Sequence, residues 1–186
     1  MEKEVSIAIS ARHVHLTNEV YDKLFDKNLT VRNNLNQKGE FAANEVVSLS
    51  TTKNRIDNVR IIGPLRTYNQ VEISATDARK FGLKPPVRKS GDLSNAEMIT
   101  ISTPKGSVTL PVCIIAERHV HMTPEMADEL GVKDGDIIKL KLSGIKSGII
   151  DIKVKVKDNA YFEVHLDTDD ANAFLLDSNS KGTLII

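Results

Sequence analysis

Tryptophan is absent from this chain, and its 186 residues include only three tyrosines and five phenylalanines. So few aromatic side chains offer little surface on which nucleotide bases could stack. Lysine and arginine together number 25, as do aspartate and glutamate, so the net charge is zero. No basic field therefore attracts nucleic acid or an anionic membrane, and we expect neither as a partner.

Cysteine is also scarce, since Cys113 is the single one and no internal disulfide can form. This composition is typical of a reducing compartment. No apolar run approaches the length of about 20 residues that spans a bilayer. The segment 1–5 has no apolar signal core. The sequence predicts a cytoplasmic protein outside the membrane, with Cys113 as a small core residue.

The five histidines, by contrast, are concentrated in three short motifs. Two motifs are the same tetrapeptide, Arg-His-Val-His, at residues 12–15 and 118–121, and His165 stands in the segment 163–167. The tetrapeptides belong to a longer repeat, in which residues 10–19 align with residues 116–125. Only two copies exist, which indicates a two-fold pseudo-symmetric protein rather than a solenoid.

Short β-branched segments separated by turn residues make up most of the remaining sequence. Strands are expected at 46–50, 59–62, 70–73, 98–101, 108–110, 113–115, 137–142, 149–156 and 183–186. Each copy of the repeat is typical of a strand followed by a short helix, with Thr123 as N-cap, Pro124 in the first turn and Gly131 as C-cap. A further helix is expected over 169–176. The predicted fold is mainly β with short capping helices, arranged as two small β-barrel domains related by the internal repeat.

The His-x-His spacing points to bound metal. On a strand, both imidazoles face the same side about 7 Å apart along the chain, and both can turn toward one ion. The two pairs can serve one metal each or share a dinuclear centre, and His165 and Glu72 are the best candidates for a further ligand. Imidazole and carboxylate ligands favour zinc or a similar divalent ion over calcium. The competing interpretation is that these histidines are hydrogen-bonded core residues, which the repetition of the motif makes less favourable.

Three arginines lie near these motifs. Arg12 and Arg118 directly precede the histidines and would face away from a metal on a regular strand, so packing or an ion pair is the simpler role. Arg66 follows the turn Gly63–Pro64 and precedes the strand that carries Glu72. A guanidinium held near a bound cation suggests that both bind an anion such as phosphate, although a surface arginine would have the same sequence.

Taken together, five segments of the chain resemble the PduL-type phosphotransacylases, a family of phosphate propanoyltransferases. The resemblance covers nearly the whole chain in the family's order. The segments are Ser10-Ala11-Arg12-His13-Val14-His15-Leu16, Gln70-Val71-Glu72-Ile73-Ser74, Pro86-Val87-Arg88-Lys89-Ser90-Gly91-Asp92, Glu117-Arg118-His119-Val120-His121-Met122 and His165-Leu166-Asp167-Thr168-Asp169-Asp170-Ala171-Asn172-Ala173.

The resemblance implies transfer of a short acyl group, propanoyl or acetyl, between coenzyme A and inorganic phosphate, with acyl phosphate as the other acyl carrier. It implies two zinc ions per subunit, or another divalent metal, at a cleft between two barrels formed by residues 12–116 and by residues 1–11 with 117–186. Arg66 is implied to bind phosphate and to act in catalysis. The implied ligands are His13, His15 and Glu72 for one zinc, and His119, His121 and His165 for the other.

The same resemblance implies a homodimer and allows functional coupling to an acyl kinase. Family members in bacterial microcompartments carry an amphipathic N-terminal extension. Here about ten residues precede the first motif. We therefore expect an enzyme that is free in the cytoplasm.

No activated serine or cysteine is evident, so the expected mechanism is direct transfer without a covalent acyl-enzyme. Two alternatives remain open. A zinc-dependent hydrolase of thioesters or acyl phosphates would use the same ligands but would need no phosphate. A non-catalytic, zinc-stabilised module would bind metal without turning over coenzyme A thioesters.

Overall fold

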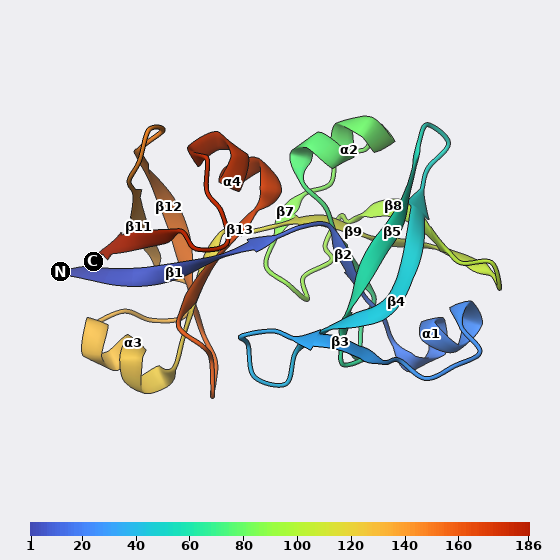
Figure 1. Cartoon of the computed structure of the whole chain (residues 1–186), viewed down its shortest axis with the longest axis horizontal. Helices are drawn as coiled ribbons and strands as arrows, with labels where there is room; N and C mark the ends of the chain where they lie inside the picture. Colours follow the sequence, from blue (N-terminus) through green and yellow to red (C-terminus); the bar gives the residue numbers. More distant parts are fainter. The chain divides into compact units, whose positions relative to one another are not determined.

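The protein, described by a computed structural model of all 186 residues, divides into two compact units. The terminal unit comprises Met1–Ala11 and Glu117–Ile186, and the central unit comprises Arg12–Ala116. Each unit holds a closed six-stranded β-barrel and two short helices (Figure 1). The prediction of a mainly β protein with two barrels and short helices is therefore confirmed. None of the helices is long and apolar enough to cross a membrane.

The barrel of the terminal unit has the strand order β1-β13-β10-β12-β11-β14, with β14 returning to β1. The N- and C-terminal strands lie side by side, with Glu2 opposite Ile185 (Figure 1). Helix α3 follows β10, and helix α4 follows β13. The elements are β1 (Glu2–Ser10), β10 (His119–Met122), α3 (Pro124–Leu130), β11 (Ile137–Leu142), β12 (Gly148–Val156), β13 (Glu163–Asp167), α4 (Thr168–Phe174) and β14 (Lys181–Ile185).

The barrel of the central unit has the strand order β4-β5-β2-β6-β9-β8, with β8 returning to β4. Two further strands extend it, β3 beside β4 and β7 beside β9. The elements are β2 (His13–His15), α1 (Asn18–Leu24), β3 (Val31–Asn34), β4 (Phe41–Ser50), β5 (Arg55–Gly63), β6 (Gln70–Glu72), α2 (Ala75–Phe81), β7 (Val87–Arg88), β8 (Glu97–Ser102) and β9 (Ser107–Ala116).

The two barrels repeat the same pattern of pairing around their His-x-His strands. β2 is antiparallel to β6 and parallel to β5, just as β10 is antiparallel to β13 and parallel to β12. The strand that precedes each motif pairs in the other unit: β1 leads into β2 but pairs with β13, while β9 leads into β10 but pairs with β6. Each barrel therefore closes with a strand that is adjacent in sequence to the other barrel's motif.

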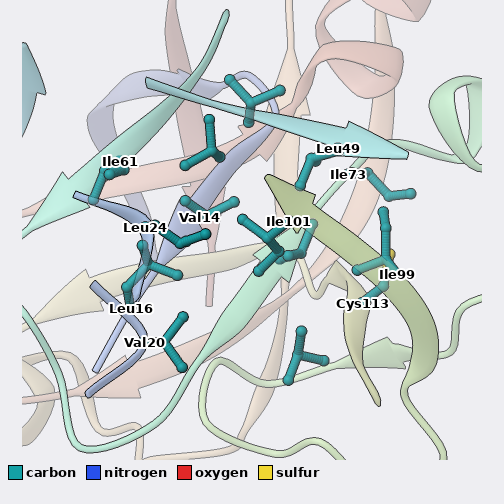
Figure 2. Packing of buried hydrophobic residues seen from close by; sticks show 14 of the residues in the cluster. Val14, Leu16, Val20, Leu24, Leu49, Ile61, Ile73, Ile99, Ile101 and Cys113 are labelled. Atoms are coloured by element: carbon teal, nitrogen blue, oxygen red, sulfur yellow. The ribbon is translucent and has the colours of Figure 1, made fainter. Parts of the chain in front are cut away.

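Strand alternation explains how one tetrapeptide serves both the core and a site. Val14 and Val120 are fully buried, and the histidines on either side of each valine project from the opposite face of the strand. Figure 2 shows Val14 in the core of the central unit, with Leu49, Ile101 and Cys113. Burying one large apolar side chain of this kind contributes about 1.5–3 kcal/mol. As predicted, Cys113 is a buried core residue.

The helix caps account for where the helices begin and end. The side chain of Thr123 accepts a hydrogen bond from the Met126 amide, and Gly131 adopts a left-handed φ of 69°, as the sequence predicts. Helix α4 stops at Phe174, earlier than expected, because Leu175 adopts a left-handed φ of 56°.

The expected elements did not include helix α2. Its cap residues were present in the sequence all the same, since Ser74 accepts from the Asp77 amide and Gly82 is left-handed with a φ of 68°.

Candidate active site

The first cluster of candidate ligands lies on strands β2 and β6 of the central unit. His13 stands opposite Glu72 across the antiparallel pair, and His15 stands opposite Gln70. The Nε2 atom of His13 lies 3.4 Å from Oε2 of Glu72, and Nε2 of His15 lies 3.9 Å from Oε1 of the same carboxylate. One ligand atom from each of His13, His15 and Glu72 lies within 4.8 Å of the others.

The second cluster occupies the equivalent strands, β10 and β13, of the terminal unit. His119 stands opposite His165, the position that Glu72 takes in the other barrel, and His121 stands opposite Glu163. The Nε2 atoms of His119 and His121 are 3.0 Å apart. One ligand atom from each of His119, His121 and His165 lies within 4.8 Å of the others. The structure therefore gathers all six residues expected as ligands into two separate groups of three.

Hydrogen bonds on the far side of two rings fix which nitrogen carries a lone pair. Nδ1 of His15 lies 3.1 Å from the Ile62 carbonyl oxygen, and Nδ1 of His119 lies 2.8 Å from the Glu117 carbonyl oxygen. A carbonyl can only accept, so in each ring Nδ1 must donate a proton and Nε2 holds the lone pair. Both lone pairs then face their own group, as a metal ligand requires.

His121 is suited to a neutral, metal-binding state. Burial, followed by the neighbouring imidazoles of His119 and His165, lowers the pKa of His121 to about 2. Its Nδ1 atom is buried without a hydrogen-bond partner. A neutral imidazole offers the lone pair that zinc binds, so both features fit a ligand better than a core histidine satisfied by hydrogen bonds.

The donor sets and their spacing fit zinc. Two ligand atoms at about 2.0–2.1 Å from a tetrahedral zinc lie roughly 3.3 Å apart, close to the 3.0 and 3.4 Å separations in the two groups. Lone pairs that face one another or a carboxylate repel unless a cation lies between them. If each group held a zinc ion, its three candidate ligands would leave a coordination position for water or substrate, the arrangement typical of catalytic zinc.

Arg66 is held in place on several sides. Its guanidinium donates to the Tyr68 hydroxyl at 2.7 Å and to the Ser90 hydroxyl at 3.4 Å. It also forms an ion pair with Glu40 at 3.1 Å, and its Cζ lies 5.6 Å from the centre of the Tyr68 ring. The Arg66 side chain is only 18% exposed and is held by several partners, so it is not a freely exposed surface arginine.

A chain of hydrogen bonds connects Arg66 with the candidate ligand Glu72. The buried amide of Gln70 donates to Oε1 of Glu72 at 2.5 Å and to the Ser90 hydroxyl at 3.0 Å, and it accepts from the Gly91 amide at 2.8 Å. Ser90 in turn contacts Arg66. Sequence reasoning did not identify Gln70 or Ser90 as part of the site, although both lie in the motifs that carried the family resemblance.

The glycine of the turn before Arg66 is required by packing. A Cβ atom at Gly63 would lie 2.3 Å from the ring of Phe41, the residue opposite it on β4. A side chain at Gly63 would have to displace this ring, which is partly buried and packs against the core of the central unit. The close approach of Phe41 thus fixes the end of β5 and the start of the turn that carries Arg66.

The arginines before the two motifs form matched ion pairs. Arg12 makes a bidentate contact with Asp77 at 2.5 and 2.9 Å, and Arg118 makes one with Asp170 at 2.8 and 2.6 Å. Each aspartate is the third residue after its helix N-cap, in α2 and α4 respectively. The ion-pair role favoured from the sequence is therefore the one observed, and it ties the start of each His-x-His strand to a helix.

Cys113 has no features of a nucleophile. It is fully buried, and burial raises the pKa of its thiol to about 12. A thiol that stays protonated at neutral pH cannot attack a thioester effectively.

Comparison with known proteins shows which family the chain belongs to. A sequence model of the family described as phosphate propanoyltransferase matches residues 6–177. Curated proteins named phosphate propanoyltransferase are similar over nearly the whole chain. The protein from Lachnoclostridium phytofermentans is 45% identical over 174 residues, covering 91% of this chain and 81% of that protein. The protein from Thermotoga maritima is 42% identical over 182 residues (95% and 87%), and the one from Salmonella typhimurium is 38% identical over 176 residues (92% and 84%). The chain therefore belongs to the phosphate propanoyltransferase family and is an acyltransferase.

Proposed function

We propose that this enzyme transfers a propanoyl or acetyl group between coenzyme A and inorganic phosphate, by direct transfer at a centre of two zinc ions. The observation that carries the proposal is the presence of two matched groups of three candidate ligands, one in each unit, in a chain that also holds a partly buried, hydrogen-bonded arginine. Family membership supports the phosphate acyltransferase activity itself.

In this proposal Arg66 binds the phosphate. Its planar fork matches two phosphate oxygens, and the contact with the Tyr68 hydroxyl orients it before the substrate arrives. Phosphate would replace the Glu40 carboxylate as the anion beside the guanidinium. A phosphate oxygen then attacks the thioester carbon, the carbon–sulfur bond breaks, and coenzyme A leaves as a thiolate.

The two ligand groups would hold the metal ions on which this chemistry depends. Bound zinc supplies a Lewis acid that polarises the thioester carbonyl or stabilises the departing thiolate. The side chains of His13, His15 and Glu72 would hold one ion, and those of His119, His121 and His165 the other. The buried, protonated thiol of Cys113 supports direct transfer over a covalent acyl-enzyme.

The experiment that tests this function is release of free thiol from propanoyl-CoA and acetyl-CoA, with and without phosphate, by protein of measured zinc content. We expect release that requires phosphate and that His13→Ala abolishes. Release without phosphate would instead identify a thioester hydrolase. A protein that binds zinc and releases thiol under neither condition would be the non-catalytic module.

We further propose that the enzyme is a cytoplasmic homodimer whose acyl phosphate is used by an acyl kinase. The single buried cysteine supports a reducing compartment, and the family resemblance supports the other two expectations. Light scattering on the purified protein measures its molar mass, and the mass of a single chain would contradict the proposed dimer. ATP formation from acyl-CoA, phosphate and ADP in the presence of an acyl kinase tests the coupling.

A further inference from the structure

Two buried polar residues occupy equivalent positions in the two barrels. Gln70 stands on β6 opposite His15, and Glu163 stands on β13 opposite His121. Gln70 is fully buried and Glu163 is 4% exposed. Each lies two residues before the third ligand of its group, on the same face of the strand. The fold therefore repeats the position in both barrels, while the type of residue differs.

Each of these side chains contacts the ligand beside it. The Gln70 amide donates to Oε1 of Glu72 at 2.5 Å, whereas Oε1 of Glu163 lies 2.9 Å from Nε2 of His165. A carboxylate ligand needs a donor as its partner, and a neutral imidazole ligand needs an acceptor for its ring N–H. Where the ligand changes from glutamate to histidine, the partner changes from donor to acceptor.

The difference between Gln70 and Glu163 also gives each of the two groups one nearby carboxylate. The group in the central unit includes one carboxylate, Glu72, among its candidate ligands, while the group in the terminal unit consists of three imidazoles and no carboxylate. Glu163 supplies a carboxylate directly behind one of these imidazoles. A divalent cation in either group is then accompanied by one carboxylate, Glu72 at 12% exposure or the buried Glu163, which lowers the free energy of holding the cation away from water.

Glu163 acts behind the ligands rather than as one of them. It does not belong to the set of ligand atoms that converge within 4.8 Å, which contains His119, His121 and His165. An imidazole nitrogen that donates its proton to a carboxylate has no lone pair for a metal. The bond from Nε2 to Glu163 therefore leaves Nδ1 as the ligand nitrogen of His165.

We propose that Glu163 is the positioning residue of the three-histidine group: its buried carboxylate fixes the ring of His165 and provides the charge that this group lacks, as Gln70 orients the charged ligand Glu72 in the other group. This inference rests on the zinc binding of the proposed function. It concerns metal affinity, which is measured without turnover and so can fail separately from the activity.

The test is competition between metal-stripped protein and a chromophoric chelator for zinc, with wild type and Glu163→Gln compared. Glutamine keeps the size and an accepting oxygen but removes the charge. We expect one of the two zinc sites to weaken by about 10- to 100-fold while the other keeps its affinity. Glu45→Gln is the matched control, because it neutralises a carboxylate that is also buried but contacts Thr30 and Lys27 instead; both of its zinc affinities should stay at wild-type values.

Two further measurements separate positioning from general damage. In a His165→Ala background, adding Glu163→Gln should weaken zinc affinity by less than it does in the wild type, because the hydrogen bond to His165 is already gone and only the effect of the charge remains. In zinc-loaded wild type, nitrogen NMR of labelled histidine should show His165 with zinc on Nδ1 and a proton protected from exchange on Nε2, which tests the contact even if the variant does not fold.

Unchanged affinity at both sites in folded Glu163→Gln, or an unprotected His165 ring in the wild type, would overturn the role of Glu163. Wild type that binds no zinc would overturn the metal part of the proposed function and this inference with it. If the wild type binds two zinc ions but releases thiol without phosphate, only the transferase reaction is overturned. The zinc affinities of wild type and Glu163→Gln would then still decide the role of Glu163.

Discussion

Replacing Arg66 is the most direct way to test how the enzyme recognises phosphate. Arg66→Ala removes a guanidinium that is 18% exposed and already oriented by Tyr68, so little of its interaction with phosphate is screened by solvent. A hydrogen bond to a charged partner contributes about 1.5–3 kcal/mol. At 1.36 kcal/mol for each factor of ten, the loss corresponds to a decrease of roughly 10- to 150-fold in kcat/KM for phosphate.

The pattern of kinetic constants distinguishes binding from other effects. Thiol release is measured over a range of phosphate concentrations at saturating acyl-CoA, and again over a range of acyl-CoA at saturating phosphate. We expect a higher KM for phosphate and slower turnover, with a smaller change in KM for acyl-CoA. Arg66→Lys keeps the charge but loses the planar fork, so it should fall between wild type and Arg66→Ala.

Arg55→Ala serves as the control, because it removes the same charge from the same unit at an exposed ion pair with Asp57. Its kinetic constants should match the wild type. Zinc content is measured for every variant, so that lost metal is not mistaken for lost phosphate binding. Unchanged phosphate dependence in zinc-loaded Arg66→Ala would refute the assignment of this residue.

Three further predictions concern stability and reactivity. Urea titrations should show that Asp77→Asn lowers the free energy of unfolding by about 2–3 kcal/mol and Asp170→Asn by about 1 kcal/mol. The difference is expected because the Asp77 side chain is 1% exposed and that of Asp170 is 14% exposed, so equal losses of stability would count against burial as the cause. Burial raises the pKa of Glu45, but its hydrogen bonds with Thr30 and Lys27 outweigh burial and lower the pKa overall, so its contribution to the free energy of unfolding is complete above the usual carboxyl pKa of 4.5 and is lost as the pH falls. Glu45→Gln should therefore lower the free energy of unfolding by about 1.5–3 kcal/mol at pH 7 and by less below pH 4.5. A loss of stability that does not change with pH would contradict the lowered pKa. Cys113, with a thiol pKa of about 12, should resist Ellman's reagent at pH 8 until the protein unfolds, and rapid labelling of the folded protein would be contrary evidence.

Local sequence patterns were sufficient for much of the fold. Alternating apolar residues define strand β12, and the cap residues Thr123 and Gly131 define helix α3. All four helices have seven residues, too few to show a clear helical period. Helix α2 was missed, although its caps Ser74 and Gly82 were present, because it does not belong to the internal repeat that indicated α1 and α3.

The sequence also identified only part of the candidate site. The repeated His-x-His motif identified four ligand candidates, because strand alternation places both imidazoles of a pair on one face whatever the rest of the fold. The partners of those ligands could not be identified, since Gln70 and Glu163 become distinctive only when strand register places them opposite His15 and His121.

The sequence by itself determined most of the strands, the pseudo-two-fold repeat and the residue types available to bind metal, because each depends on spacing along the chain. Only the tertiary structure decided which residues meet. Antiparallel pairing sets His13 against Glu72 and His119 against His165, separations of 59 and 46 residues that no local pattern encodes. Burial and register then decide the environment of each group, because the charge and hydrogen-bonding state of a side chain depend on the neighbours that the fold places around it.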